Sequence, residues 1–106
     1  MTPLDMLTAA RRIIEYAHNH NDQSFLSNHR DQDAILRQLT IIGEAAKRIS
    51  AELRGAHPGI PWRRIAGFRD VVVHDYFHVD LDEVWRIVQN DVPDLVKLIT
   101  PLVPPP

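Results

Sequence analysis

The stretch from Arg69 to Tyr76 carries an arginine, two aspartates, a histidine and a tyrosine around three valines. Valine side chains favour burial, whereas the polar and charged side chains require water, a ligand or one another. Histidine titrates near neutral pH and can serve as an acid or a base, and arginine presents a fixed fork of donors to an anion. The stretch therefore combines an acid–base group with an anion-binding group, which the rest of the chain must hold in place.

The spacing within this stretch predicts which side chains meet if the stretch is helical. Asp70 and His74 are four residues apart, so the carboxylate can hydrogen-bond and orient the imidazole. Arg69 and Tyr76 fall within about 20° of each other on a straight helix, whereas Arg69 and His74 lie about 140° apart. Either the helix deforms near His74, or a second copy of the chain supplies half of the site.

A purely structural role also fits this spacing. Arg69 and Asp70 can form a surface ion pair, which contributes little to stability. His74 can cap a helix end, and Tyr76 can pack its ring. Spacing alone favours this second interpretation, because most such clusters in helical proteins are structural.

Length and composition predict one small domain. The chain has 106 residues, of which 44% are hydrophobic, and it contains no cysteine. A disulfide framework and a thiolate zinc site are thereby excluded, and the composition suits a reducing compartment. The first residues do not resemble a signal peptide, and no apolar run is long enough to span a bilayer. We therefore expect a cytoplasmic protein without a membrane partner, a metal or a cofactor.

The net charge of −2 argues against general electrostatic binding of nucleic acid. An RNA partner would have to be held by a local basic patch. Its candidate residues are Arg63, Arg64 and Arg69, with Lys47 and Arg48 as further members.

Apolar residues at three- and four-residue steps predict an all-α bundle, and we find no strand-like alternation. Thr2 and Asp80 are expected to cap two of the helices, and Pro93 is expected to kink the last one. Gly55 is a plausible helix stop, and residues 21–33 are expected to form a loop with at most one helical turn. The predicted helices cover residues 3–17, 33–53, 61–78 and 80–99, followed by a non-helical tail at 101–106.

Two further features allow more than one interpretation. His18 and His20 suggest a metal site, but residues two apart on a helix point away from each other, so solvated histidines are the preferred interpretation. Glu44 is by default a solvated residue, but it is also a possible partner for an arginine of the motif. The small residues 43–46 around it permit the close approach of another helix.

Several stretches together resemble one family. Arg69–Tyr76 matches the pattern RxxxxHxY, with an acid directly after the arginine, which resembles the signature of the HEPN superfamily and of its HepT-like toxins. Gln38–Lys47 resembles the second helix of that family, Ile60–Asp70 resembles the approach to its motif, and Val79–Trp85 resembles the helix that follows. The resemblance covers nearly the whole chain.

This resemblance implies a bundle of four to five antiparallel helices over residues 1–100, which dimerises so that two motifs face each other. It also implies a metal-independent ribonuclease that needs no cofactor. A MntA-like minimal nucleotidyltransferase would be its antitoxin and would transfer AMP to Tyr76. Arg69 and His74 would be catalytic and Asp70 would support them, while Arg63 and Arg64 would bind RNA.

Two other functions remain open at this point. The bundle can be a non-catalytic module that docks a nucleotidyltransferase, which the negative net charge favours. It can also be a structural bundle whose motif serves folding alone.

Overall fold

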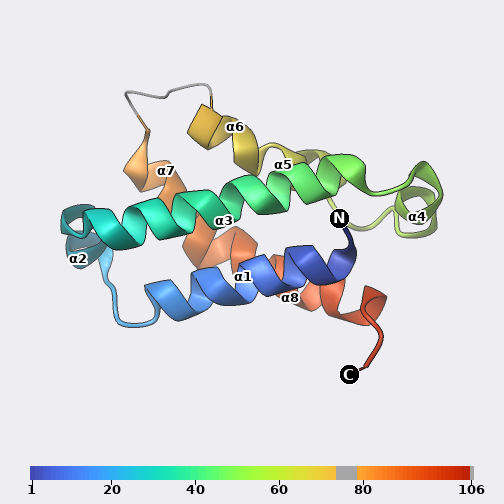
Figure 1. Cartoon of the computed structure of the whole chain (residues 1–106), viewed down its shortest axis with the longest axis horizontal. Helices are drawn as coiled ribbons and strands as arrows, with labels where there is room; N and C mark the ends of the chain where they lie inside the picture. The colour runs from blue at the N-terminus through green and yellow to red at the C-terminus, as the bar shows by residue number, and fades with distance from the viewer. Residues whose placement is uncertain (74–78, 106) are drawn as a thin grey trace.

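Two long antiparallel helices, α1 (Pro3–Ala17) and α3 (His29–Arg48), lie side by side and form the frame of the bundle (Figure 1). The computed structural model describes residues 1–73 and 79–105, and all regular structure within these ranges is helical. The all-α prediction is therefore confirmed. The predicted contacts of His74 and Tyr76 lie outside the described residues.

The predicted start of α1 is confirmed in detail. Thr2 accepts a hydrogen bond from the backbone N–H of Asp5, and the Asp5 carboxylate accepts one from the backbone N–H of Thr2. This capping box satisfies backbone donors that the first helical turn leaves free. The side of α1 that faces the core carries Met6, Leu7, Ala9, Ala10 and Ile13.

The predicted loop at 21–33 is wrong, because two helices begin there. Asn21 and Ser24 form a second capping box at the start of α2 (Asp22–Ser27), and Asn28 caps α3 by accepting from the backbone N–H of Asp31. These polar residues, which suggest a loop, act as helix caps. Phe25 in α2 is fully buried and stacks on Trp85, with ring centroids 4.7 Å apart.

The second predicted helix is divided. α3 ends at Arg48, because Ile49 takes an extended conformation and the Ser50 side chain caps a new helix, α4 (Ala51–Ala56). Gly55 lies inside α4, so its predicted role as a helix stop is wrong. The predicted apolar face of α3 is confirmed by the burial of Ile35, Leu39, Ile42 and Ala46.

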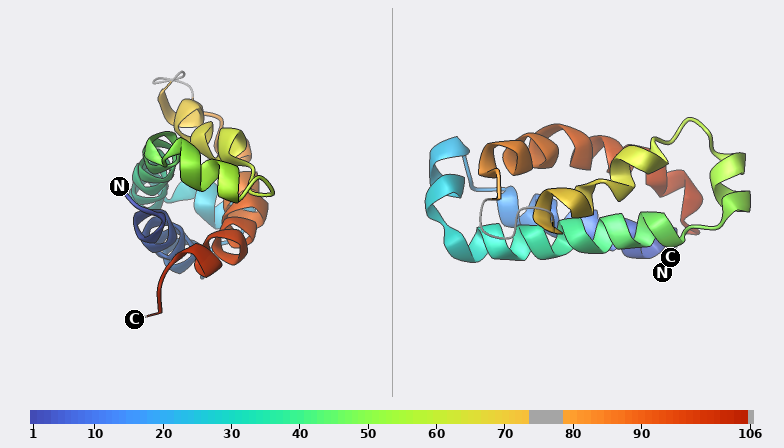
Figure 2. Two further views of the ribbon diagram at one scale, coloured as in Figure 1. Left: turned by 90° about the vertical axis from the view of Figure 1, so that its right-hand side faces the viewer. Right: turned by 90° about the horizontal axis from the view of Figure 1, so that it is seen from above.

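The segment that leads into the motif forms two short helices, α5 (Trp62–Ala66) and α6 (Phe68–Val73), instead of the single predicted one. They are separated at Gly67, whose carbonyl oxygen accepts a hydrogen bond from the backbone N–H of Asp70, three residues later. Both helices pack on α3, on the side away from α1 (Figures 1 and 2).

The last helical segment loses its regular α-helical hydrogen bonding where the proline predicts a kink or a break. α7 (Leu81–Arg86), which Asp80 caps as expected, leads into a π-helical turn, η1 (Ile87–Asp91), and then into α8 (Val92–Ile99). Pro93 has no backbone N–H, so the regular ladder of hydrogen bonds cannot continue through it. The chain then makes a 3₁₀ turn, η2 (Thr100–Leu102), which departs from the expected non-helical tail.

The core lies between α1, α3 and the α7–α8 segment, with α5 and α6 closing its upper side (Figure 2). Within residues 1–73 and 79–105, no helix has the length and apolar character that crossing a membrane requires.

Candidate active site

Helices α3 and α6 approach each other closely at Gly43 of α3. A Cβ atom added to Gly43 would lie 2.7 Å from Cβ of Arg69, 2.8 Å from its backbone N and 3.0 Å from the carbonyl oxygen of Ala66. Real Cβ atoms essentially never show contacts below 3.0 Å. Only the hydrogen of glycine fits here, which confirms the predicted close approach and fixes the backbone of Arg69 against α3.

The next residue of α3 holds the side chain of Arg69. Oε1 of Glu44 lies 2.9 Å from Nε of Arg69, and the two side chains are 29% and 33% exposed. The default interpretation of Glu44 as a solvated residue is therefore wrong, and the alternative of a partner for a motif arginine is confirmed. No single stretch of sequence brings these two residues together, because they lie on different helices.

Asp70 follows Arg69 on α6 and is exposed. Its predicted contact with His74 and the predicted role of Tyr76 lie outside the described residues.

The two predicted RNA-binding arginines of α5 differ in their surroundings. Arg64 forms two hydrogen bonds with Asp91 of η1, from Nε at 2.9 Å and from Nη2 at 2.8 Å. These hydrogen bonds raise the pKa of Arg64 above its ordinary value, so the group stays charged. Arg63 is exposed, and no ion pair joins it to another described residue. Arg63 is therefore the better placed of the two for an external anion.

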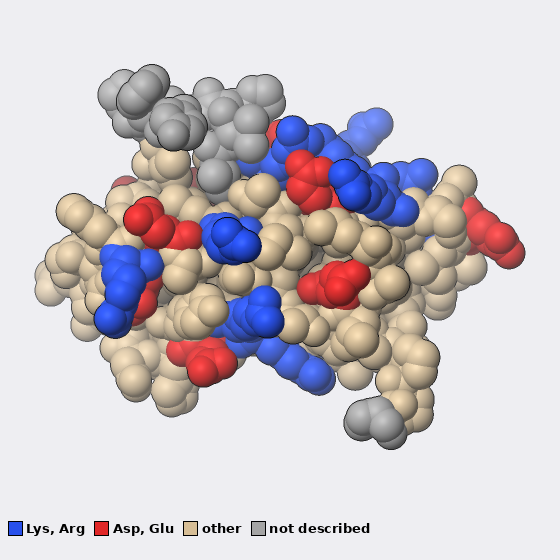
Figure 3. Space-filling model, in the orientation of Figure 1, with Lys and Arg blue, Asp and Glu red and all other residues tan. Residues whose placement is uncertain are grey.

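Basic side chains gather on one face of the molecule, over α5 and the adjacent end of α3 (Figure 3). The exposed basic residues of these elements are Arg63, Arg64, Lys47 and Arg48. A local basic patch thus exists on a chain whose net charge is negative.

A groove of about 720 Å³ lies beside α5 and α6, lined mainly by apolar side chains, among them Trp62, Phe68, Val71 and Ile87.

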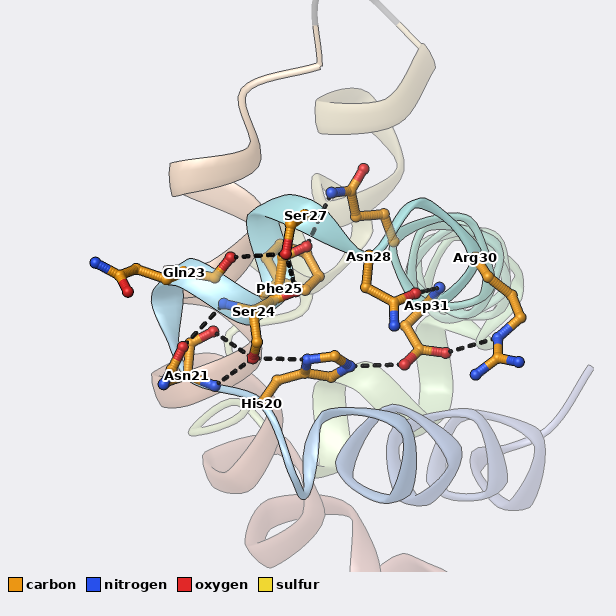
Figure 4. A network of polar contacts seen from close by, with 10 residues as sticks. His20, Asn21, Gln23, Ser24, Phe25, Ser27, Asn28, Arg30 and Asp31 are labelled. Carbon is orange, nitrogen blue, oxygen red and sulfur yellow. Dashed lines mark hydrogen bonds and ion pairs between the residues drawn. The ribbon is translucent and has the colours of Figure 1, made fainter.

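The histidine-rich region forms a different polar cluster at the start of α3 (Figure 4). His20 Nδ1 lies 2.9 Å from Oγ of Ser24, and its Nε2 lies 2.6 Å from Oδ2 of Asp31. The prediction that His20 is a solvated helix-end residue is therefore wrong, whereas His18 is exposed as expected.

This cluster resembles a serine–histidine–aspartate relay in composition only. The Ser24 hydroxyl accepts from the backbone N–H of Asn21 and contacts its carbonyl oxygen, so it belongs to the cap of α2. We interpret the cluster as a tie between α2 and α3. Across the described part of the chain, no three His, Cys, Asp or Glu side chains form a group that could hold a metal ion.

Comparison with known proteins identifies the family. The model of the family "Ribonuclease HepT-like" matches residues 6–102. This range includes Arg69 on the short helix α6. The chain belongs to this HepT-like ribonuclease family, a HEPN family, as the motif predicts.

Relatives of similar length agree with this assignment. A "Probable ribonuclease HepT" of Thermococcus cleftensis is 40% identical over 91 residues, which cover 86% of this chain and 83% of the relative. A "Putative RNase MJ1380" of Methanocaldococcus jannaschii is 36% identical over 93 residues, which cover 88% of this chain and 85% of the relative. No solved structure gives a significant match.

Proposed function

We propose that this protein is a metal-independent endoribonuclease in which Arg69 and His74 are the central residues. The observation that carries the proposal is the placement of Arg69 in a chain of this family. Its backbone is fixed by the contact with Gly43, while its side chain is about one third exposed and paired with Glu44. An arginine held in this way can meet a phosphate from solvent without first being ordered.

The chemistry uses groups that the chain itself supplies. Cleavage of RNA without a metal requires deprotonation of the 2′-hydroxyl, protonation of the leaving 5′-oxygen and stabilisation of the charge on the pentacoordinate phosphorus. His74 is suited to proton transfer near neutral pH, and Arg69 is suited to the phosphorane charge. Asp70 would orient His74. The 2′-oxygen displaces the 5′-oxygen, so the products are a 2′,3′-cyclic phosphate and a 5′-hydroxyl.

A homodimer would supply what one copy lacks. One histidine cannot easily be the base and the acid at opposite ends of an in-line displacement, whereas two copies facing each other offer one of each. The separation of about 140° between Arg69 and His74 on a straight helix supports the same arrangement.

The first experiment measures RNA cleavage by the wild type, Arg69→Ala and His74→Ala, together with the oligomeric state of each. We expect both variants to lose cleavage and growth inhibition while remaining dimers. Full activity of His74→Ala would refute the proposal, and so would loss of wild-type activity on addition of a chelator.

We also propose that the protein is the toxin of a toxin–antitoxin pair, with a MntA-like nucleotidyltransferase as its antitoxin. AMP attached to Tyr76 would place a bulky anion two residues from His74, where it would compete with the RNA phosphate. Incubation with the cognate nucleotidyltransferase and ATP should add the mass of AMP to the wild type but not to Tyr76→Phe. Equal labelling of Tyr76→Phe would exclude this acceptor.

The second candidate function is a non-catalytic module that docks the nucleotidyltransferase. The net charge of −2 and the engagement of Arg64 by Asp91 favour it, because both weaken the attraction for RNA. It predicts a stable complex with the nucleotidyltransferase and no cleavage by the purified protein at any concentration.

A further inference from the structure

The residue pair Gly43-Glu44 of α3 contacts both the backbone and the side chain of Arg69. We infer that Glu44 is a positioning residue for Arg69 in RNA cleavage, and that Gly43 sets the helix spacing that makes this possible. The inference rests on the proposed ribonuclease function and adds a carboxylate that the RxxxxHxY motif does not contain.

The backbone contact limits where Arg69 can lie. The Cβ position of Gly43 points at Cβ and N of Arg69, at 2.7 and 2.8 Å, and at the carbonyl oxygen of Ala66. Any larger residue at this position would push α6 away from α3. Since the side chain of Arg69 starts from this fixed point, the reach of its guanidinium is set by the spacing of the two helices.

The carboxylate then restricts the side chain itself. An arginine side chain has many rotamers, and a partly exposed one samples them unless something holds it. Glu44 contacts Nε at 2.9 Å, on the inner edge of the guanidinium. A contact at Nε does not use the two terminal nitrogens of the guanidinium, and these are the donors that can bind two oxygens of one phosphate.

The choice of partner supports a role beyond helix stability. Lys47 and Arg48 lie three and four residues after Glu44, which are the spacings at which ion pairs form along one helix. The ion pair found for Glu44 among the described residues instead crosses to α6 and joins Arg69. Glu44 therefore acts between helices, at the residue on which the motif depends.

A carboxylate beside a phosphate-binding arginine orients the arginine but does not increase the affinity for substrate. It repels the RNA phosphate, so removing its charge should not weaken binding. Its benefit would be seen in the transition state, where the orientation of Arg69 matters most. A positioning role therefore predicts a fall in kcat without a rise in KM.

The test compares Glu44→Gln with Glu15→Gln, a matched change at an exposed residue of α1, using full-length protein and a single-stranded RNA substrate. We expect Glu44→Gln to lower kcat by about 10- to 100-fold, with KM unchanged or lower. Glu15→Gln should match the wild type. In an Arg69→Lys background, Glu44→Gln should cause much less further loss, because the two changes act on the same contact.

An activity-independent measurement separates this inference from the proposed function. The ¹⁵N–¹H signal of the Arg69 Nε group should shift in Glu44→Gln and stay in place in Glu15→Gln. Lack of cleavage by the wild type would refute the proposed function, whereas an unshifted Arg69 signal would refute the positioning role. Wild-type kcat in Glu44→Gln would also overturn the inference. So would loss of the acidic limb of the pH–rate profile with an unshifted Arg69 signal, since that combination defines a general base.

Discussion

Helix α3 pairs a carboxylate with a basic side chain at two places, and the two pairs differ in how much of each is left for a ligand. Near its start, Asp31 binds His20, whose side chain is 11% exposed and whose two ring nitrogens both have partners. Thirteen residues later, about 20 Å along the helix, Glu44 binds Arg69, whose side chain is 33% exposed. The His20–Asp31 pair lies inside a network of helix caps. The Glu44–Arg69 pair joins α3 to α6, the helix on which the motif begins.

A structural polar cluster and a candidate active site differ in how many of their polar atoms already have partners within the protein. In the His20 cluster, the polar atoms satisfy one another and the ends of α2 and α3, so a ligand would have to break existing hydrogen bonds. At Arg69, one edge of the guanidinium is held and the side chain remains accessible. His18 and His20 suggest a metal site in the sequence, but the structure ties His20 to Ser24 and Asp31, whereas the side chain of Arg69 is one third exposed.

The largest expected effect contrasts these two regions directly. Arg69→Ala should lower the rate of RNA cleavage by about 10²- to 10³-fold, because it removes charge stabilisation from the transition state, and it should leave the melting temperature close to that of the wild type. His20→Ala should do the opposite. It should lower the free energy of unfolding by about 1 kcal/mol or more and keep the cleavage rate per folded molecule.

The control for His20→Ala is His18→Ala, which changes an exposed histidine at the end of the same helix. Its stability should stay within about 0.5 kcal/mol of the wild type. Equal loss of cleavage in His20→Ala and Arg69→Ala would remove the distinction between the two regions.

The second prediction concerns the helix spacing at the site. Gly43→Ala should lower the free energy of unfolding by about 1–3 kcal/mol, because the added methyl group meets the backbone of Arg69. Chemical denaturation measures this change. Gly55→Ala is the matched control, since no atom lies within 4 Å of the added Cβ in α4, and it should be neutral or stabilising by up to about 1 kcal/mol. Equal effects of the two variants would mean that the close approach of α3 and α6 is not needed.

The third prediction tests the His20 cluster through pH. The hydrogen bond with His20 lowers the pKa of Asp31 below its ordinary value of 3.8. A lowered pKa in the folded state means that the ionised carboxylate stabilises the fold above the unfolded-state pKa, and that this stability is lost as the pH falls through the folded-state value. The stability difference between the wild type and Asp31→Asn should therefore be full at pH 6 and shrink below about pH 4. A difference that stays constant down to pH 2 would show that Asp31 does not gain its stability from ionisation.

The smallest expected effect concerns the basic face near the site. Arg63→Ala should weaken RNA binding a few-fold and reduce the slope of log affinity against log salt by about one. Arg64→Ala should change affinity less, because Asp91 already binds the Arg64 guanidinium. Titrations at several salt concentrations would compare them. A larger loss in Arg64→Ala would reverse the order that the ion pairs predict.

Local signals in the sequence were sufficient for much of the fold. Thr2 and Asp80 cap helices as expected, because a cap depends on residues only three positions away. The irregular, π-helical stretch before Pro93 also follows from one residue. By contrast, the prediction of a loop with at most one helical turn at 21–33 underestimates the helix there, because Asn21 and Ser24 are typical both of loops and of capping boxes. The break at Gly67 was missed as well.

The candidate site could be predicted only in part, for a physical reason. The motif points to Arg69 by its spacing, but the partner of Arg69 comes from another helix, and the periodicity of one helix does not reveal cross-helix pairs. Gly43 is the available signal, because a glycine within a strong helical pattern indicates close packing; the acid beside it, Glu44, is by default a solvated residue and only by the alternative a partner for Arg69. The same limit applies to Asp31 and His20.

The central claim is that this chain cuts RNA with its own side chains, and the end groups of the product test it most directly. Wild-type protein in excess EDTA should produce fragments that end in a 2′,3′-cyclic phosphate and begin with a 5′-hydroxyl, at the rate seen without the chelator. Fragments with 5′-phosphate ends, or cleavage that stops when EDTA is added, would show that the chain does not cut RNA by this metal-independent reaction.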